Sequence, residues 1–202
     1  MLKIAVLISG GGSNLQSIIN NIKKGYMECS IEYVISDREG AYGIERAKRA
    51  GITAIVFDKK TFGNISDNIY QIISGRVDYI VLAGFLSILK GDLIREFKNR
   101  IINIHPSLIP SFCGAGMYGI NVHKKALEYG VKVSGCTVHF VDDGTDTGPI
   151  ILQKAVQVLD GDTPESLQSR VLEQEHTALS EAIKLIAENR IKIDGRKVCI
   201  LK

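Results

Sequence analysis

The chain has 202 residues, of which 45% are hydrophobic and 23% are charged, as in folded domains with a sizeable core. Its 25 basic and 22 acidic side chains leave a net charge of +3, too small and scattered an excess to favour nucleic acid as the main partner. No apolar run reaches the roughly 18 residues of a membrane span, and the first residues show no charged n-region with a cleavage site, so we expect neither an integral membrane protein nor a secreted one. The four cysteines form no C-x-x-C pair, so we expect reduced thiols and a cytoplasmic protein.

The first half of the chain alternates short apolar runs with helical patterns. Continuous apolar runs indicate buried parallel strands, and apolar residues at i, i+3, i+4 and i+7 indicate amphipathic helices. The predicted strands are Leu2–Ile8, Ile31–Ile35, Ile52–Phe57 and Val77–Ala83. The predicted helices are Ser13–Lys24, Ala41–Ala50 and Ile65–Ile73.

The second half departs from this alternation. Two longer alternating segments joined by a loop containing Asp-Gly favour antiparallel strands, and a Thr-Pro-Glu sequence opens a long helix with a capping threonine and proline at the first helical position. The predicted strands are Arg100–Ile104, Lys132–Val141 and Ile150–Val158, followed by a terminal hairpin over Ile191–Leu201. The predicted helices are a short one over Asn121–Glu128 and a long one from Thr163 to about Asn189.

This order of elements predicts an α/β protein built on an open, mostly parallel, twisted sheet. Strands that alternate with helices form βαβ units with right-handed crossovers, so residues 1–100 are expected to form a Rossmann-like half. Residues 101–202 are expected to contribute antiparallel strands. With no repeat, low-complexity tract or linker between the halves, we expect a single domain over residues 1–202.

A glycine-rich loop, Ser9–Asn14, lies between the first strand and the first helix. Glycine lets a backbone approach a ligand closely, and a helix N-terminus offers free N–H groups to phosphate. The loop is not a Walker A motif, and Leu15 occupies the place of the third glycine in the dinucleotide fingerprint. It is therefore predicted to bind phosphate, the alternative being a tight turn in which Ser13 caps the helix.

Asn103 and His105 lie two residues apart at the end of a predicted strand, so their side chains share a face. An amide donor beside an imidazole suits stabilisation of an oxyanion and proton transfer near neutral pH. The carboxyl edge of an open α/β sheet is also where ligands usually bind. A structural role for a histidine that precedes a proline is the alternative.

The loop Asp142–Pro149 carries three aspartates and two glycines. It lacks EF-hand spacing, so a solvated turn is the simplest interpretation. An aspartate that reached His105 would orient its ring and raise its pKa, but spacing alone does not say which aspartate does so.

The remaining histidines and cysteines give weaker signals. His139 is expected to be a packed or hydrogen-bonded strand residue, and Glu175 and His176 are expected to be exposed on the long helix. Cys113 and Cys136 have no evident activating partner, so neither is assigned as a nucleophile.

Five segments together resemble the phosphoribosylglycinamide formyltransferase family of folate-dependent enzymes, and the likeness covers essentially the whole chain. These segments are Ser9–Gln16, Leu82–Phe85, Asn103–Pro110, Val138–Val141 and Asp146–Pro149. The Asn-x-His pair with a downstream aspartate is common to 10-formyltetrahydrofolate-dependent transferases, and the Ser-Asn-Leu-Gln sequence is more specific to the glycinamide enzyme. The resemblance implies transfer of a formyl group from 10-formyltetrahydrofolate, a co-substrate, to the amine of glycinamide ribonucleotide, with no metal.

The resemblance also implies a role for each matching residue. The catalytic residues would be Asn103, His105 and Asp146. The ribonucleotide would contact Gly12, Ser13, Asn14 and Glu175. The folate pocket would involve Leu86, Ser87, Ile88, Leu89, Asn103, Val141 and Asp142. By stabilising the imidazolium, Asp146 is expected to keep His105 protonated near neutral pH.

The chain departs from the family pattern in two places. The arginine that many members carry near Asn64 and Ile65 is absent, although Lys59 and Lys60 are close, and the stretch Cys113–Ile120 is longer than usual. The length of the chain disfavours the related methionyl-tRNA formyltransferase and formyltetrahydrofolate deformylase. A non-catalytic nucleotide-binding module would give no reason for the catalytic residues to occur together. The expected partners are small-molecule substrates without nucleic acid or membrane, and the expected state is a monomer or homodimer.

Overall fold

The structure, a computed structural model, describes residues 1–202 as two compact units, Met1–Asn103 and Ile104–Lys202. The first unit is a parallel sheet with helices between its strands, ordered β3-β2-β1-β4-β5. Its strands are β1 (Leu2–Ile8), β2 (Cys29–Ser36), β3 (Thr53–Val56), β4 (Tyr79–Leu82) and β5 (Ile101–His105), the last of which ends in the second unit. Its helices are α1 (Ser13–Lys23), α2 (Tyr42–Arg49), α3 (Lys59–Phe62), α4 (Ile65–Ile73) and α5 (Asp92–Glu96).

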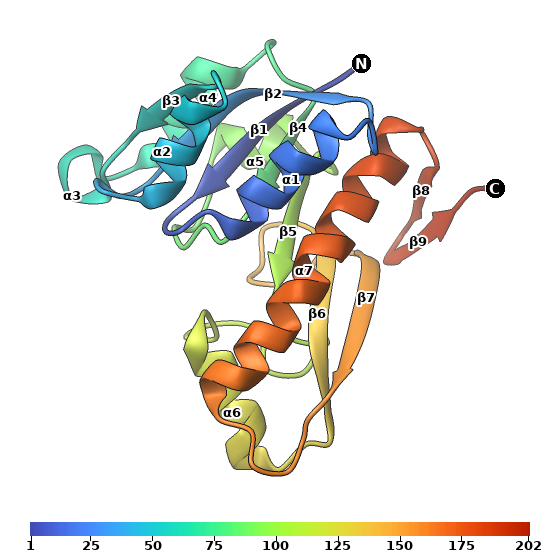
Figure 1. Cartoon of the computed structure of the whole chain (residues 1–202). Coiled ribbons are helices and arrows are strands. Elements are labelled where there is room, and N and C mark those ends of the chain that lie inside the picture. Colours follow the sequence, from blue (N-terminus) through green and yellow to red (C-terminus); the bar gives the residue numbers. More distant parts are fainter. The chain divides into compact units, whose positions relative to one another are not determined.

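The core of the first unit forms around β1, because the five consecutive residues Ile4–Ile8 are fully buried. A strand buried on both faces has no polar alternation, which explains the continuous apolar run in the sequence. Helix α1 turns Leu15, Ile18 and Ile19 inward, and α1 and α2 contact each other and β2 (Figure 1).

The strand order indicates at which edge of the sheet in the first unit a ligand is expected to bind. Strand β1 pairs with β2 on one side and with β4 on the other, so the chain reverses direction across the sheet at β1. In open α/β sheets, ligands bind beyond the carboxyl ends of the strands at such a point. Here the ends of β1 and β4 are tied together, because the Ser9 N–H donates to the Gly84 carbonyl at 3.0 Å and the Leu86 N–H donates to Ser9 Oγ at 2.8 Å.

The second unit packs a long helix along an antiparallel strand pair. Helix α7 contacts β6, β7 and α6 (Figure 1). Thr163 and Ser166 form a capping box at its start, with Pro164 as the first helical residue, which confirms the predicted start of the helix. The elements of the unit are α6 (Ile120–Tyr129), β6 (Val133–Phe140), β7 (Ile150–Gln157), α7 (Pro164–Ala187) and the hairpin strands β8 (Ile191–Asp194) and β9 (Lys197–Ile200).

The predicted fold class is confirmed, since the first unit holds the parallel sheet and the second holds the antiparallel pair. Helices α3 and α5 were not predicted, because helices of four and five residues are too short to show a periodic pattern. Strand β2 begins at Cys29, two residues earlier than predicted. None of the helices has the length and hydrophobicity that a membrane span requires.

Candidate active site

The second unit brings two histidines and an aspartate together. The two carboxylate oxygens of Asp146 face different rings, with Oδ2 3.6 Å from Nδ1 of His105 and Oδ1 3.6 Å from Nε2 of His139. Both histidines are buried, His105 at the end of β5 and His139 near the end of β6. Asp146 is thus the aspartate of the loop that reaches His105, a question that spacing had left open.

Backbone carbonyls fix the protonated nitrogen of each ring. His105 Nε2 lies 2.9 Å from the Phe112 carbonyl, and His139 Nδ1 lies 2.8 Å from the Phe140 carbonyl. A carbonyl can only accept, so each of these nitrogens carries a hydrogen. In the neutral His105 ring, the Nδ1 that faces Asp146 therefore has no proton, so it is a potential proton acceptor beside the carboxylate.

The pKa of His105 is below its ordinary value of 6.5. Burial lowers the pKa most, while the Phe112 carbonyl and the negative charge of Asp146 raise it and the nearby His139 lowers it. The expectation that Asp146 keeps His105 protonated near neutral pH is therefore wrong, because desolvation of the imidazolium outweighs its attraction to the carboxylate. His105 is neutral at pH 7.

The pKa of Asp146 is also below its ordinary value. Burial raises the pKa of this carboxyl, but the His139 ring, the Gly114 N–H and the charge of His105 together lower it by more. The carboxylate is therefore the stable form at pH 7, and it remains available as the partner of any proton that reaches a neighbouring ring.

One short segment holds both Asp146 and His105. The Gly114 N–H donates to Asp146 Oδ2 at 2.9 Å, two residues after the carbonyl that binds His105. Phe112 and Asp146 have φ of 49° and 57°, in the left-handed region that non-glycine residues rarely occupy. Such conformations concentrate at functional sites, where the surrounding structure holds them in place.

Asn103 lies two residues before His105 in β5 and pairs in register with Leu82 of β4. Alternation along a strand puts the two side chains on one face, as the sequence predicted.

Val141 directly follows β6. Asp142 shapes the loop after it, because its Oδ1 accepts from the Gly144 N–H at 3.1 Å and from Thr147 Oγ1 at 2.5 Å.

The glycine-rich loop of the first unit ends at Gly12, the left-handed residue before α1. A Cβ on Gly12 would lie 2.7 Å from the Cα of Gly43, so only glycine fits this position. No side chain caps α1, and Ser13 is its first residue, so the alternative that Ser13 caps the helix is wrong. Arg46 Nε donates to the Gly11 carbonyl at 2.8 Å, which adds a positive charge beside a helix N-terminus already suited to anions.

The segment Leu86–Leu89 follows β4 in the first unit and alternates in exposure. Leu86 and Ile88 are 41% and 77% exposed, whereas Ser87 and Leu89 are buried. Exposed apolar side chains at the carboxyl edge of a sheet provide a surface on which a flat apolar ligand can lie.

Glu175 lies on the buried face of α7, so its expected exposure is wrong.

The thiol of Cys136 is also buried, and burial raises its pKa to about 12. The pKa of Cys113 is raised, first by burial and then by the charge of Asp146, which does not activate a thiol. All four cysteines are free, and no group of three or more His, Cys, Asp or Glu side chains is placed to hold a metal ion.

A formyl transferase family model matches residues 2–183. The chain belongs to the formyl transferase family. It is 47% identical to glycinamide ribonucleotide transformylase 1 from Symbiobacterium toebii, whose crystal structure it matches with a TM-score of 0.90 over 100% of this chain and 95% of that one. The resemblance drawn from the sequence motifs is confirmed.

The chain spans different shares of two curated relatives. It is 44% identical to the trifunctional purine biosynthetic protein adenosine-3 of Gallus gallus over 98% of this chain and 20% of the relative. It is 40% identical to the chloroplastic phosphoribosylglycinamide formyltransferase of Arabidopsis thaliana over 94% of this chain and 67% of the relative. The chain therefore spans about a fifth of the first relative and two thirds of the second.

Two histidines have contacts that the sequence does not predict. His139 is a packed, hydrogen-bonded strand residue as expected, but its contact with Asp146 was missed. His123 in α6 is also buried, its Nδ1 has no hydrogen-bond partner, and the charge of His105 acts on it. Neither histidine has the spacing of a metal ligand, so the sequence gives no signal for these contacts, which depend on the fold.

His123 makes the stability of the protein sensitive to acid. Burial, followed by the nearby His105, lowers the pKa of His123 from 6.5 to about 4. The unfolded chain therefore binds this proton near pH 6.5 and the folded chain only near pH 4, so the folded state loses stability as pH falls between these values. We expect this histidine to contribute about 3 kcal/mol of that loss.

Urea unfolding of the protein and of a His123→Gln variant at about pH 7 and pH 4 measures this contribution. The difference in unfolding free energy between the two pH values should be smaller in the variant, because other titrating groups are common to both proteins. Equal pH dependence in the two proteins would contradict the assignment to His123.

Proposed function

We propose that the protein transfers the formyl group of 10-formyltetrahydrofolate to the amine of glycinamide ribonucleotide in de novo purine biosynthesis. The products are N-formylglycinamide ribonucleotide and tetrahydrofolate. The observation that carries the proposal is the contact of Asp146 with His105 in a chain of the formyl transferase family. His105 lies two residues after Asn103 on the same strand. The names of the relatives from Symbiobacterium toebii and Arabidopsis thaliana support the choice of substrate.

The proposed reaction needs donors for a developing oxyanion. The amine attacks the formyl carbon, and negative charge develops on the formyl oxygen. The Asn103 amide and the Nε2–H of His105 donate to this oxygen, and the loss of one such donor typically costs about 3 kcal/mol in the transition state. A neutral His105 suffices for this role, because its Nε2 already carries a hydrogen.

The reaction also needs a route for a proton. The attacking nitrogen loses a proton, and the folate nitrogen gains one as its bond to the formyl carbon breaks. The unprotonated Nδ1 of His105 is suited to accept the first proton, since the resulting imidazolium lies 3.6 Å from Asp146 Oδ2. His105 then returns the proton to the leaving nitrogen, directly or through water. The negative charge of Asp146 stabilises the imidazolium while the proton is in transit.

In this scheme, substrate displaces the Phe112 carbonyl from His105. The Phe112 carbonyl accepts the hydrogen bond from His105 Nε2–H that the formyl oxygen needs. The same segment also holds Asp146, through the Gly114 N–H. Gly114, Gly116 and Gly119 all have positive φ, so side chains would be strained at these positions of the segment. Binding of the formyl group is proposed to release this segment.

The ribonucleotide phosphate is proposed to bind at the start of α1. Gly12, Ser13 and Asn14 provide the close backbone approach and the positive end of the helix, and Arg46 is adjacent. Glu175 of the second unit is proposed as a further contact to this substrate. A carboxylate suits the hydroxyl groups of a ribose, because it accepts hydrogen bonds only.

The folate is proposed to bind along Leu86, Ser87, Ile88 and Leu89 of the first unit and near Asn103, Val141 and Asp142. The exposed Leu86 and Ile88 supply apolar area for the flat pteridine and benzoyl rings. Small molecules are thus the proposed partners, without nucleic acid or membrane. The cytoplasmic location, the single domain and the monomeric or homodimeric state stay predictions.

Thermal unfolding with each substrate tests this assignment. Glycinamide ribonucleotide and a folate analogue should each raise the melting temperature, because each binds the folded state. The Asn14→Ala variant should lose most of the shift with the ribonucleotide and keep the shift with the folate analogue. An unchanged ribonucleotide shift in this variant would contradict the phosphate site, and the absence of both shifts from the unaltered protein would contradict the proposed substrates.

A further inference from the structure

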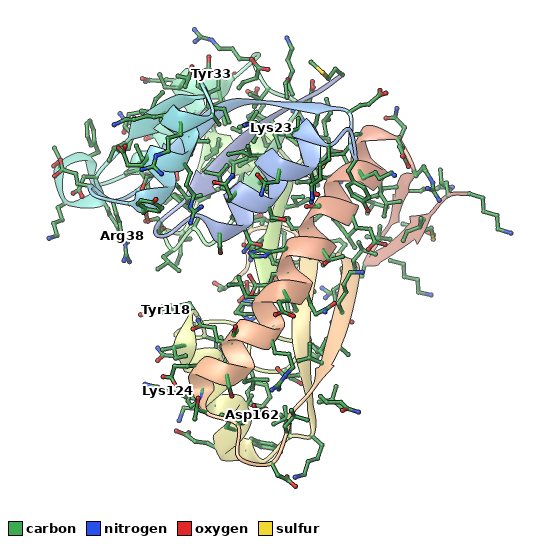
Figure 2. All side chains as sticks on the ribbon, in the orientation of Figure 1. Lys23, Tyr33, Arg38, Tyr118, Lys124 and Asp162 are labelled. Carbon is green, nitrogen blue, oxygen red and sulfur yellow. The ribbon has the colours of Figure 1, made fainter.

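A cavity of about 860 Å³ opens in the first unit at the carboxyl ends of β2, β3 and β4. Three loops line it, contributing Asp37–Glu39, Asp58–Thr61 and the pair Leu86–Ser87. Arg38, labelled in Figure 2, projects from the surface of the first unit beside it. Its volume lies in the range of pockets that bind small molecules.

The wall of this cavity contains a buried carboxylate with one unused oxygen. Asp37 is 4% exposed, and its Oδ2 accepts a hydrogen bond from Ser87 Oγ at 2.7 Å. Its Oδ1 has no hydrogen-bond partner. Leaving a buried acceptor without a donor is costly, and native structures rarely do so without a functional reason. The carboxylate is therefore suited to a ligand that brings hydrogen-bond donors.

The same cavity carries positive charges that are not used within the protein. Arg38, Lys59 and Lys60 are exposed, and their side chains form no ion pair. Asp58, in contrast, is engaged by the backbone, since it accepts from the Lys60 N–H at 2.8 Å and from the Glu39 N–H at 3.5 Å. The free cations are suited to an anionic group on the ligand.

We propose that this cavity binds a ribonucleoside 5′-monophosphate. The ribose hydroxyls donate to Asp37, the phosphate binds Lys59, Lys60 and Arg38, and the base lies against the exposed side of Leu86. The position of the carboxylate supports the choice of a ribose. Asp37 directly follows β2, which lies beside β1, and in doubly wound folds an acidic residue at the end of this strand binds ribose hydroxyls.

This site is separate from the proposed ribonucleotide site at Gly12–Asn14. It shares Leu86 and Ser87 with the proposed folate surface, so a bound nucleotide would compete with folate. Nucleotide binding itself requires neither substrate of the transfer reaction. A failure of nucleotide binding is therefore distinguishable from a failure of the proposed function.

Isothermal titration of the full chain with adenosine 5′-monophosphate tests the proposal, with the 2′,3′-dideoxy analogue and inorganic phosphate as comparison ligands. The dideoxy analogue should bind at least about tenfold more weakly than the ribonucleotide, because it lacks the donors for Asp37. Equal affinity of the two nucleotides, or no saturable binding of the ribonucleotide below about 1 mM, would overturn the proposal.

Variants locate the bound nucleotide. Asp37→Asn should weaken ribonucleotide binding about tenfold and leave the weak dideoxy binding unchanged, and a Lys59→Ala, Lys60→Ala double variant should weaken both. Asp194→Asn and a Lys192→Ala, Lys197→Ala double variant, all in the terminal hairpin, are the charge-matched controls and should bind as the unaltered protein does. Loss of binding in these controls would overturn the proposal.

Asn14→Ala distinguishes this cavity from the site at the start of α1. It should leave the affinity for adenosine 5′-monophosphate unchanged, and loss of binding in this variant would place the nucleotide at the other site and overturn the proposal. If Asp37→Asn does not fold, the two nucleotides on the unaltered protein and the double lysine variant still decide the outcome.

Discussion

Replacing Asp146 with asparagine should lower the rate of formyl transfer by about a thousandfold. Asparagine keeps the shape of the side chain, but it removes the charge that stabilises an imidazolium at His105. Its amide also places a donor against the unprotonated Nδ1 of His105 and thereby blocks the position that must receive a proton. The loss should fall on kcat more than on the KM of either substrate, because the charge acts in the transition state.

Steady-state kinetics of the Asp146→Asn variant measure this effect. Asp160→Asn is the matched control, since Asp160 is an exposed aspartate whose one ion pair, with Lys132, lies at the surface. The control should retain the kcat of the unaltered protein. A kcat within about tenfold of the unaltered protein in Asp146→Asn would remove this residue from the catalytic machinery.

His105→Ala should lower kcat by about a hundredfold to a thousandfold, because it removes one oxyanion donor and the proton carrier together. Burial lowers the pKa of His105 below 6.5, so the neutral ring that accepts a proton predominates at pH 7. In the unaltered protein, kcat should therefore fall as pH falls through this lowered pKa. The residual activity of the variant should lack this acid limb.

Added imidazole distinguishes a chemical role of His105 from a structural one. The substitution leaves space where the buried ring stood, and imidazole that enters it should restore part of the rate. Circular dichroism should show the same secondary structure in the variant. Near-normal turnover without imidazole, or an unchanged acid limb, would contradict the assigned role.

The fold could be predicted because its main elements carry their signals locally. The run Leu2–Ile8 is apolar on both faces of a buried strand, and Thr163-Pro164 marks a helix start whatever the helix packs against. Helix α3 has no such signal, because four residues form little more than one turn. It depends instead on Asp58, which caps it through the Lys60 N–H.

The candidate site could be predicted where spacing along one element determines geometry. Asn103 and His105 share a face because strands alternate, and Gly12 precedes a helix because the apolar period begins after it. Two contacts depend instead on loops that connect different elements: the contact of Asp146 with His139, and the contact of His105 with the Phe112 carbonyl. The predicted direction of the pKa shift of His105 was wrong for a related reason, because all the elements packed around a ring determine how far it is buried.

The most direct test of the account is a transfer assay with the purified protein and 10-formyltetrahydrofolate labelled in its formyl carbon. With glycinamide ribonucleotide present, the label should appear on the ribonucleotide in a one-to-one ratio with tetrahydrofolate. Without the ribonucleotide, no labelled formate should form. Release of labelled formate at the same rate with or without the ribonucleotide, or the absence of any label on the ribonucleotide, would contradict the proposed transferase activity.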